Sequence, residues 1–163
     1  MVRILISLLI LISASAQAQL TTDNLNAIVG EWTGTLTYLN YRDDKTLVTL
    51  PVEVTATNAG KSIDLIMIFE EPGGGTERRT DKIKLKKNQI VFSGDWDLGG
   101  ATVQDNNHWE VEMSKEGMDN NLKSDFLQIM KVTNDDILIT KKVRYRGGEF
   151  FMRNEYKLKR KVD

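Results

Sequence analysis

The chain has 163 residues, of which 22 are lysine or arginine and 23 are aspartate or glutamate, and its net charge is −1. It contains no cysteine and one histidine. This composition excludes disulfides, cysteine nucleophiles and the usual zinc sites, so we expect no metal centre. The near-neutral charge argues against a nucleic-acid partner and against a polybasic contact with a membrane.

The N-terminus has the three regions of a secretory signal peptide. Arg3 supplies the positive charge, residues 4–12 form a run that is apolar except for Ser7, and Ala16-Gln17-Ala18 matches a small-residue cleavage site. The run is too short for a membrane anchor, which needs ~20 apolar residues. Without cysteine the chain also has no thiol for a lipid anchor. We therefore expect residues 1–18 to be removed after Ala18, and residues 19–163 to be a single domain that is secreted or periplasmic.

The mature sequence predicts one short helix followed by strands. Residues 22–29 can form a helix that Thr21 caps and Gly30 ends. After this helix, apolar and polar residues alternate with period 2 between turns rich in Gly, Asn and Asp, which is typical of half-buried strands. Strands are expected at residues 32–38, 46–56, 63–69, 79–85, 89–96, 109–113, 125–132, 137–145 and 150–159.

The connections between these strands are short, among them a turn at residues 42–45 and a glycine-rich loop at 98–100. Strands joined by short turns are antiparallel neighbours. We predict an all-β fold, an antiparallel up-and-down β-barrel of nine or ten strands, because closure removes the two edges that an open sheet would expose. A two-sheet sandwich is the alternative. Pro51 lacks an N–H group and should lie at an edge or a bulge.

The C-terminal part of the chain is locally basic. It carries lysine or arginine at positions 141, 142, 144 and 146 and again at 157 and 159–161. At strand periodicity such a run is typical of a solvated sheet face whose edge is protected by charge. A specific anion site is the alternative.

The first strand opens on Gly30-Glu31-Trp32-Thr33-Gly34. This start resembles the G-x-W signature of the calycin superfamily of lipocalin-like barrels, and its extended form is most similar to the nitrobindin-like branch. The resemblance implies that Trp32 closes one barrel end beneath a basic side chain from a late strand, for which Arg153 and Arg160 are the candidates. Nitrobindin-like barrels hold haem through a histidine near the C-terminus. Because no histidine follows His108, we expect no cofactor, with haem as the alternative.

Fatty-acid-binding proteins, another group of calycins, carry an arginine and a tyrosine two residues apart in the last strand to hold a carboxylate. Here Arg153 and Tyr156 are three residues apart. Side chains alternate between the two faces of a strand, so these two are expected to point to opposite faces.

The side chains left as candidates for binding a ligand are mainly aromatic residues and an asparagine. Tryptophan and tyrosine both pack against a ligand and hydrogen-bond to it, and a barrel of about ten strands is wide enough to leave interior space. We expect a non-catalytic binding protein that holds a small apolar or amphipathic ligand inside the barrel. The candidate ligand-binding residues are Tyr38, Trp96, His108, Tyr145, Asn154 and Tyr156.

Two other functions are open on the sequence. One is a protein–protein interaction module with a filled barrel. The other is a small hydrolase or isomerase in which Glu110 or Glu112 orients His108, although no serine stands in a nucleophile-elbow pattern and no catalytic residue is assigned. An interior void above ~300 Å³, the lower end of ligand pockets, separates the binding protein from the interaction module.

Overall fold

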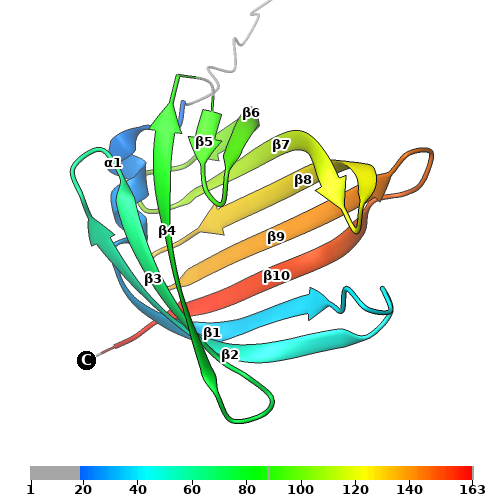
Figure 1. Ribbon diagram of the computed structural model, residues 1–163. Coiled ribbons are helices and arrows are strands. Elements are labelled where there is room, and N and C mark those ends of the chain that lie inside the picture. The colour runs from blue at the N-terminus through cyan, green and yellow to red at the C-terminus, as the bar shows by residue number, and fades with distance from the viewer. Residues whose placement is uncertain (1–18, 88, 163) are drawn as a thin grey trace, which may run out of the picture.

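Ten antiparallel strands close into a barrel in the order β1-β10-β9-β8-β7-β6-β5-β4-β3-β2 (Figure 1). The computed structural model describes residues 19–87 and 89–162, so the predicted signal peptide lies outside the described residues. The predicted barrel is confirmed, and the sandwich alternative is wrong. The strands are β1 Gly30–Leu39, β2 Leu47–Asn58, β3 Ile63–Glu70, β4 Thr76–Lys86, β5 Gln89–Val91, β6 Asp95–Val103, β7 Trp109–Asp119, β8 Leu122–Val132, β9 Asp136–Tyr145 and β10 Phe151–Arg160.

The alternation of apolar and polar residues explains the strands. In β2, Leu50, Val52, Val54 and Ala56 are buried, and the residues between them are exposed. The period of side-chain direction in a strand is 2, so this sequence buries one face and solvates the other. Pro51 lies just before Val52, the first β2 residue paired with β3, and therefore occupies a local edge.

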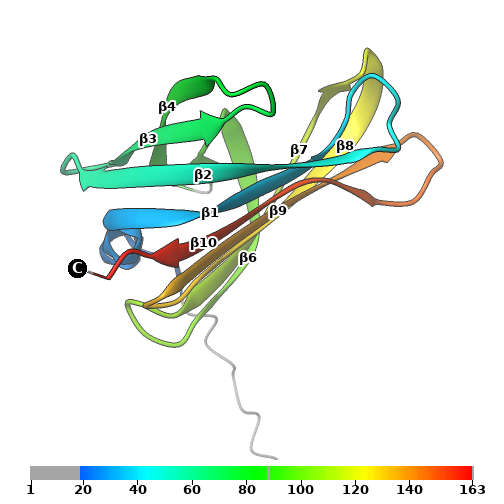
Figure 2. The same ribbon diagram turned by 90° about the horizontal axis from the view of Figure 1, so that it is seen from below.

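The expected helix is present but is divided into α1 Thr22–Leu25 and the 3₁₀ turn η1 Asn26–Ile28. Thr21 caps α1 through a reciprocal pair of hydrogen bonds with Asn24. Leu25 and Ile28 are buried in the core, so the two short elements cover one end of the barrel (Figure 2). No helix within the described residues has the length and hydrophobicity needed to cross a bilayer.

The prediction of a single strand at residues 89–96 followed by a glycine-rich loop is wrong. The chain turns earlier, where Ser93 and Gly94 adopt φ values of 51° and 112°, and β6 then runs on through Gly99 and Gly100. A register shift between Leu98 and Gly100 absorbs the extra residue. A glycine inside a strand often marks such a bulge, and this explains Gly99 and Gly100. The tight turn forms instead at residues 93 and 94, where the backbone adopts positive φ values.

A second bulge interrupts β10, where the register with β9 shifts between Met152 and Asn154. A bulge adds one residue to a strand and changes which face the following side chains take. Arg153 is therefore buried inside the barrel, on the same side as Asn154 and Tyr156. The expectation that Arg153 and Tyr156 point to opposite faces is wrong for this reason.

Gly34 of β1 lies directly against the backbone of β10. A Cβ atom at this position would stand 1.9 Å from the carbonyl oxygen of Lys157 on the neighbouring strand. We expect Gly34→Ala to lower the free energy of unfolding by about 3 kcal/mol, measured by urea denaturation, because backbone must move to accommodate the methyl group. Gly100→Ala is the matched control, since nothing lies within 4 Å of its added Cβ. Equal stability of the two variants would contradict this reading of the β1–β10 contact.

Candidate functional site

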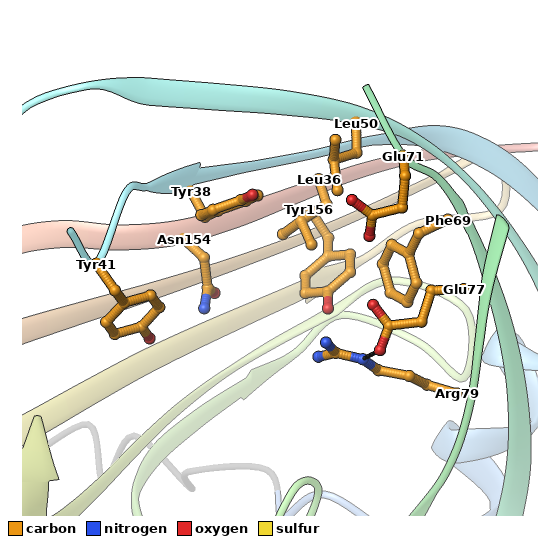
Figure 3. A pocket seen from close by; sticks show the side chains of 10 residues that line it. All are labelled: Leu36, Tyr38, Tyr41, Leu50, Phe69, Glu71, Glu77, Arg79, Asn154 and Tyr156. Atoms are coloured by element: carbon orange, nitrogen blue, oxygen red, sulfur yellow. Dashed lines mark hydrogen bonds and ion pairs between the residues drawn. The ribbon is translucent and has the colours of Figure 1, made fainter. Parts of the chain in front are cut away.

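The half of the barrel away from α1 contains an open cavity of about 360 Å³ (Figure 3). Strands β1, β2, β3, β4 and β10 and the loops at Tyr41 and Glu71 form its wall. The volume exceeds the lower end of ligand pockets. The lining residues are Leu36, Tyr38, Tyr41, Leu50, Phe69, Glu71, Glu77, Arg79, Asn154 and Tyr156.

The inner part of this cavity is apolar. Leu36, Leu50 and Phe69 are buried residues that belong to the hydrophobic core. Beyond them, toward α1, core side chains fill the barrel and leave a void of only about 20 Å³. Tyr156 lines both spaces and forms the floor of the cavity. The interior is therefore divided into a packed half and a hollow half.

Polar groups occupy the outer part of the cavity. Figure 3 shows Tyr38 and Asn154 on one side and Arg79 and Glu77 on the other. Arg79 Nε donates to Glu77 Oε1 at 2.8 Å, and its guanidinium lies 5.5 Å from the centroid of the Phe69 ring. Burial raises the pKa of the Tyr156 phenol to about 12, so this hydroxyl stays protonated and can donate to a ligand.

A buried ionic cluster, which we name the Arg153 cluster, lies near the mouth. Arg153 is 0% exposed and bonds to Asp44 at 2.7 Å, to Asp119, and to the Tyr145 hydroxyl at 2.8 Å. Asn120 joins the cluster by donating to Asp44 at 2.8 Å. The hydrogen bond from Arg153 lowers the pKa of the Asp44 carboxyl, and burial raises the pKa of Tyr145. The cluster ties the β1–β2 loop to β7, β9 and β10.

The structure brings together three of the six predicted ligand-binding residues, Tyr38, Asn154 and Tyr156, in the wall of the cavity. Trp96 and Tyr145 are not among the residues that line this space. Trp96 is buried in the core, where its indole N–H donates to the carbonyl of Phe92 at 2.8 Å. Tyr145 bonds to Arg153 and Asp119.

His108 lies apart from the large cavity, in a separate pocket of about 150 Å³. Its Nδ1 atom is 2.9 Å from the carboxylate of Asp105 in the loop before β7. Among the described residues, no group of three or more His, Cys, Asp or Glu side chains is arranged to hold a metal ion. Within the described chain, His108 makes no hydrogen bond with Glu110 or Glu112, the two residues that the enzyme hypothesis pairs with it.

The two candidate closing arginines lie in different places. The Arg160 guanidinium carbon is 4.1 Å from the centroid of the Trp32 ring, and its N–H groups donate to the carbonyls of Ala27, Val29 and Asn134. Arg153 instead belongs to the cluster near the mouth. The basic side chain over Trp32 is therefore Arg160.

The prediction missed the charged residues of β4 that face the cavity. Alternation counted back from Ile83 and Leu85, which pack with the core, places Asp81, Arg79 and Glu77 on the same inward face. This signal was present in the sequence. Charged residues are mostly exposed in proteins, so the sequence alone argues against placing these three side chains inside the barrel. The open cavity allows Arg79 and Glu77 to face inward.

No protein-family model and no curated protein matches the chain. Among solved structures, the chain is similar to Rv2717c from M. tuberculosis, with a TM-score of 0.61 and 15% identity over 85% of this chain and 95% of that protein. It also matches a protein of unknown function from the DUF3598 family of Nostoc punctiforme, with a TM-score of 0.47 and 13% identity over 84% of this chain and 49% of that one. The similarity to Rv2717c and the ten strands fit a lipocalin-like barrel fold.

Proposed function

We propose that this protein binds a small amphipathic molecule in the hollow half of its barrel. The observation that carries the proposal is the cavity of about 360 Å³, which has an apolar inner wall and a polar mouth. Ligand pockets are typically concave and mostly apolar, with a few convergent polar groups that orient the ligand. A hollow interior argues against the interaction module with a filled barrel.

The arrangement of the wall supports a particular orientation of the ligand. Its apolar part packs against Leu36, Leu50 and Phe69, and its polar part reaches the Tyr156 hydroxyl and the Asn154 amide. Arg79 Nε donates to Glu77, and within the described chain the Arg79 guanidinium makes no other hydrogen bond. Its remaining N–H groups are thus available to a polar or anionic group at the mouth.

Two further parts of the proposal start from the sequence. Membership of the calycin superfamily is supported by the Gly30-x-Trp32-x-Gly34 start and by Arg160 packed on Trp32. Ligand capture in the periplasm or outside the cell is supported by the signal-peptide pattern of residues 1–18. Native mass spectrometry of protein purified from its own host would identify a retained ligand directly.

The test uses N-phenyl-1-naphthylamine, an uncharged probe whose fluorescence rises in an apolar environment. We expect saturable binding to the wild-type protein and at least about tenfold weaker binding to Asn154→Trp, because the indole would occupy the cavity. Lys157→Trp is the matched control, since this exposed residue of the same strand adds the same side chain outside the barrel.

Circular dichroism verifies that both variants retain the β-sheet signal. The absence of saturable probe binding to the wild-type protein would contradict the proposal. Equal affinities of Asn154→Trp and Lys157→Trp would contradict the assignment of the cavity as the site.

A further inference from the structure

Two lysines point into the barrel from β7 and β9. Lys115 Nζ lies 4.0 Å from the centroid of the Trp96 ring, and Lys141 Nζ lies 4.6 Å from the centroid of the Phe126 ring. The two rings contact each other edge-on, with centroids 6.5 Å apart. Both ammonium groups therefore lie along one stretch of the interior wall. The expectation that the basic run from residue 141 is only a solvated face is wrong for Lys141.

The strand register connects this stretch to the cavity. Lys141 pairs across the sheet with Gln128 of β8 on one side and with Asn154 of β10 on the other. Asn154 lines the cavity and pairs in turn with Tyr38. Directly paired residues of neighbouring strands lie next to each other on the same face. Lys141 therefore lies beside the cavity wall, next to Asn154, although the residues that line the cavity itself include neither lysine.

Neither of these lysines forms an ion pair within the described chain. Among the described residues, Lys141 makes no ion pair or hydrogen bond, and Lys115 Nζ has only the Ser93 carbonyl at 3.4 Å. Asp119 interacts favourably with Lys141, but its carboxylate already accepts from Arg153 and Tyr145. Asp95 interacts favourably with Lys115, but its carboxylate already pairs with Lys86. Burial lowers the pKa of both lysines, and the charge of Lys115 lowers that of Lys141 further.

The unpartnered buried polar atoms at the same wall are all hydrogen-bond donors. In the part of the chain that the structure describes, two buried side-chain atoms have no partner, Gln128 Nε2 and Arg153 Nε. Gln128 is 4% exposed and lies beside Lys141, and Arg153 precedes Asn154 in the bulge of β10. Buried donors are nearly always satisfied in native proteins. A group that complemented these donors and the two ammonium groups would carry acceptors and negative charge.

We propose that Lys115, Lys141 and Gln128 bind the anionic group of the ligand, a carboxylate or a phosphate, inside the barrel. This inference rests on the proposed function, since the apolar part of the same ligand occupies the cavity that Asn154 lines. The anion accepts hydrogen bonds from both ammonium groups and from the Gln128 amide, and it offsets their uncompensated charge.

The test compares two probes that differ by one anionic group. 8-Anilinonaphthalene-1-sulfonate carries a sulfonate on the same ring system as the uncharged N-phenyl-1-naphthylamine. We expect the wild-type protein to bind the sulfonate more tightly than the uncharged probe. Lys141→Met should weaken binding of the sulfonate by about tenfold and change the affinity for the uncharged probe by less than about twofold, since a hydrogen bond to a charged group is lost.

Lys142→Met is the matched control, because it removes the same charge from the neighbouring, outward-facing position of β9. Its affinity for the sulfonate should remain within about twofold of wild type, since charges outside the barrel are screened by solvent. Equal loss in the two variants, or no preference of the wild-type protein for the sulfonate, would overturn the anion site. Retained binding of the uncharged probe in that case leaves the proposed function standing, whereas failure of both probes overturns both.

Competition against the bound sulfonate separates the sources of the anion. Displacement by dodecanoate but not by inorganic phosphate identifies an amphipathic carboxylate, and displacement by dodecyl phosphate alone identifies an amphipathic phosphate. Displacement by inorganic phosphate at similar concentration would contradict an anchoring apolar part and restrict the site to free anions.

Discussion

Replacing Arg153 with methionine is expected to lower the free energy of unfolding by about 3–5 kcal/mol and the melting temperature by roughly 10 °C. The side chain is 0% exposed and bonds to two carboxylates and a tyrosine hydroxyl. Its removal leaves Asp119, which is 5% exposed, without its counter-ion. Breaking one partner of a buried ion pair is costly because the remaining charge is neither solvated nor paired.

A surface pair on the same barrel provides the control. Arg144 Nη2 lies 2.8 Å from Asp125 Oδ2, and both side chains are nearly half exposed. Arg144→Met should cost less than about 1 kcal/mol, because water screens this pair and solvates the carboxylate that remains. Urea denaturation measures both variants. Similar losses for Arg153→Met and Arg144→Met would contradict the structural role of the buried cluster.

Hydrogen exchange offers a local measurement of the same substitution. The cluster holds residues 40–46 through Asp44, which accepts from Arg153 and from Asn120. In Arg153→Met the amides of this loop should exchange faster than in the wild-type protein, because opening the loop no longer requires breaking the ion pair. The amides of the packed half of the barrel should be affected less. Adding Asp119→Asn should recover part of the lost stability, since the uncompensated charge is then removed.

The second large effect is expected at the closed end of the barrel. Trp32→Ala should lower the free energy of unfolding by about 3–5 kcal/mol, because it leaves a large void in a fully packed region. The ring is 0% exposed, its N–H donates to the carbonyl of Ile28 at 2.7 Å, and Arg160 packs on its face. The ring thereby joins the N-terminal turn to the first and last strands.

Trp32→Phe separates packing from hydrogen bonding at this position. It keeps an aromatic ring beneath Arg160 but removes the donor to Ile28, and should cost about 1–3 kcal/mol. Urea denaturation should order the three proteins as wild type, Trp32→Phe and Trp32→Ala, from most to least stable. A loss below about 1 kcal/mol for Trp32→Ala would contradict the role of this ring in closing the barrel.

Much of the fold could be predicted because its signal is local. Alternation in β2 shows on its own which side chains face inward, and Ile137, Ile139, Val143 and Leu158 obey the same rule in β9 and β10. The prediction failed where a single residue changed the phase. Bulges shift the register in β6 and β10. A bulge whose residues keep negative φ values needs no glycine and therefore leaves little signal in the sequence.

The candidate site was predictable only in part. Tyr38, Asn154 and Tyr156 could be found because inward tyrosine and amide groups on end strands are natural ligand contacts. Trp96 was assigned to the ligand, although its indole N–H has a carbonyl partner within the core. Lys141 was assigned to the surface, although alternation from Ile137 and Ile139 places it inside.

The sequence by itself determined an all-β chain with a short capped helix, a meander of strands and a tryptophan at the start of the first strand, because each of these depends on residues close together in the chain. Only the tertiary structure decided that half of the barrel is hollow, so that charged side chains such as Arg79 and Lys141 can occupy inward positions, and that the bulge of β10 places Arg153 in the interior. The interior volume of a barrel depends on side chains from ten strands at once. The free-energy cost of an inward charge depends on which polar groups of other strands lie beside it in the closed barrel.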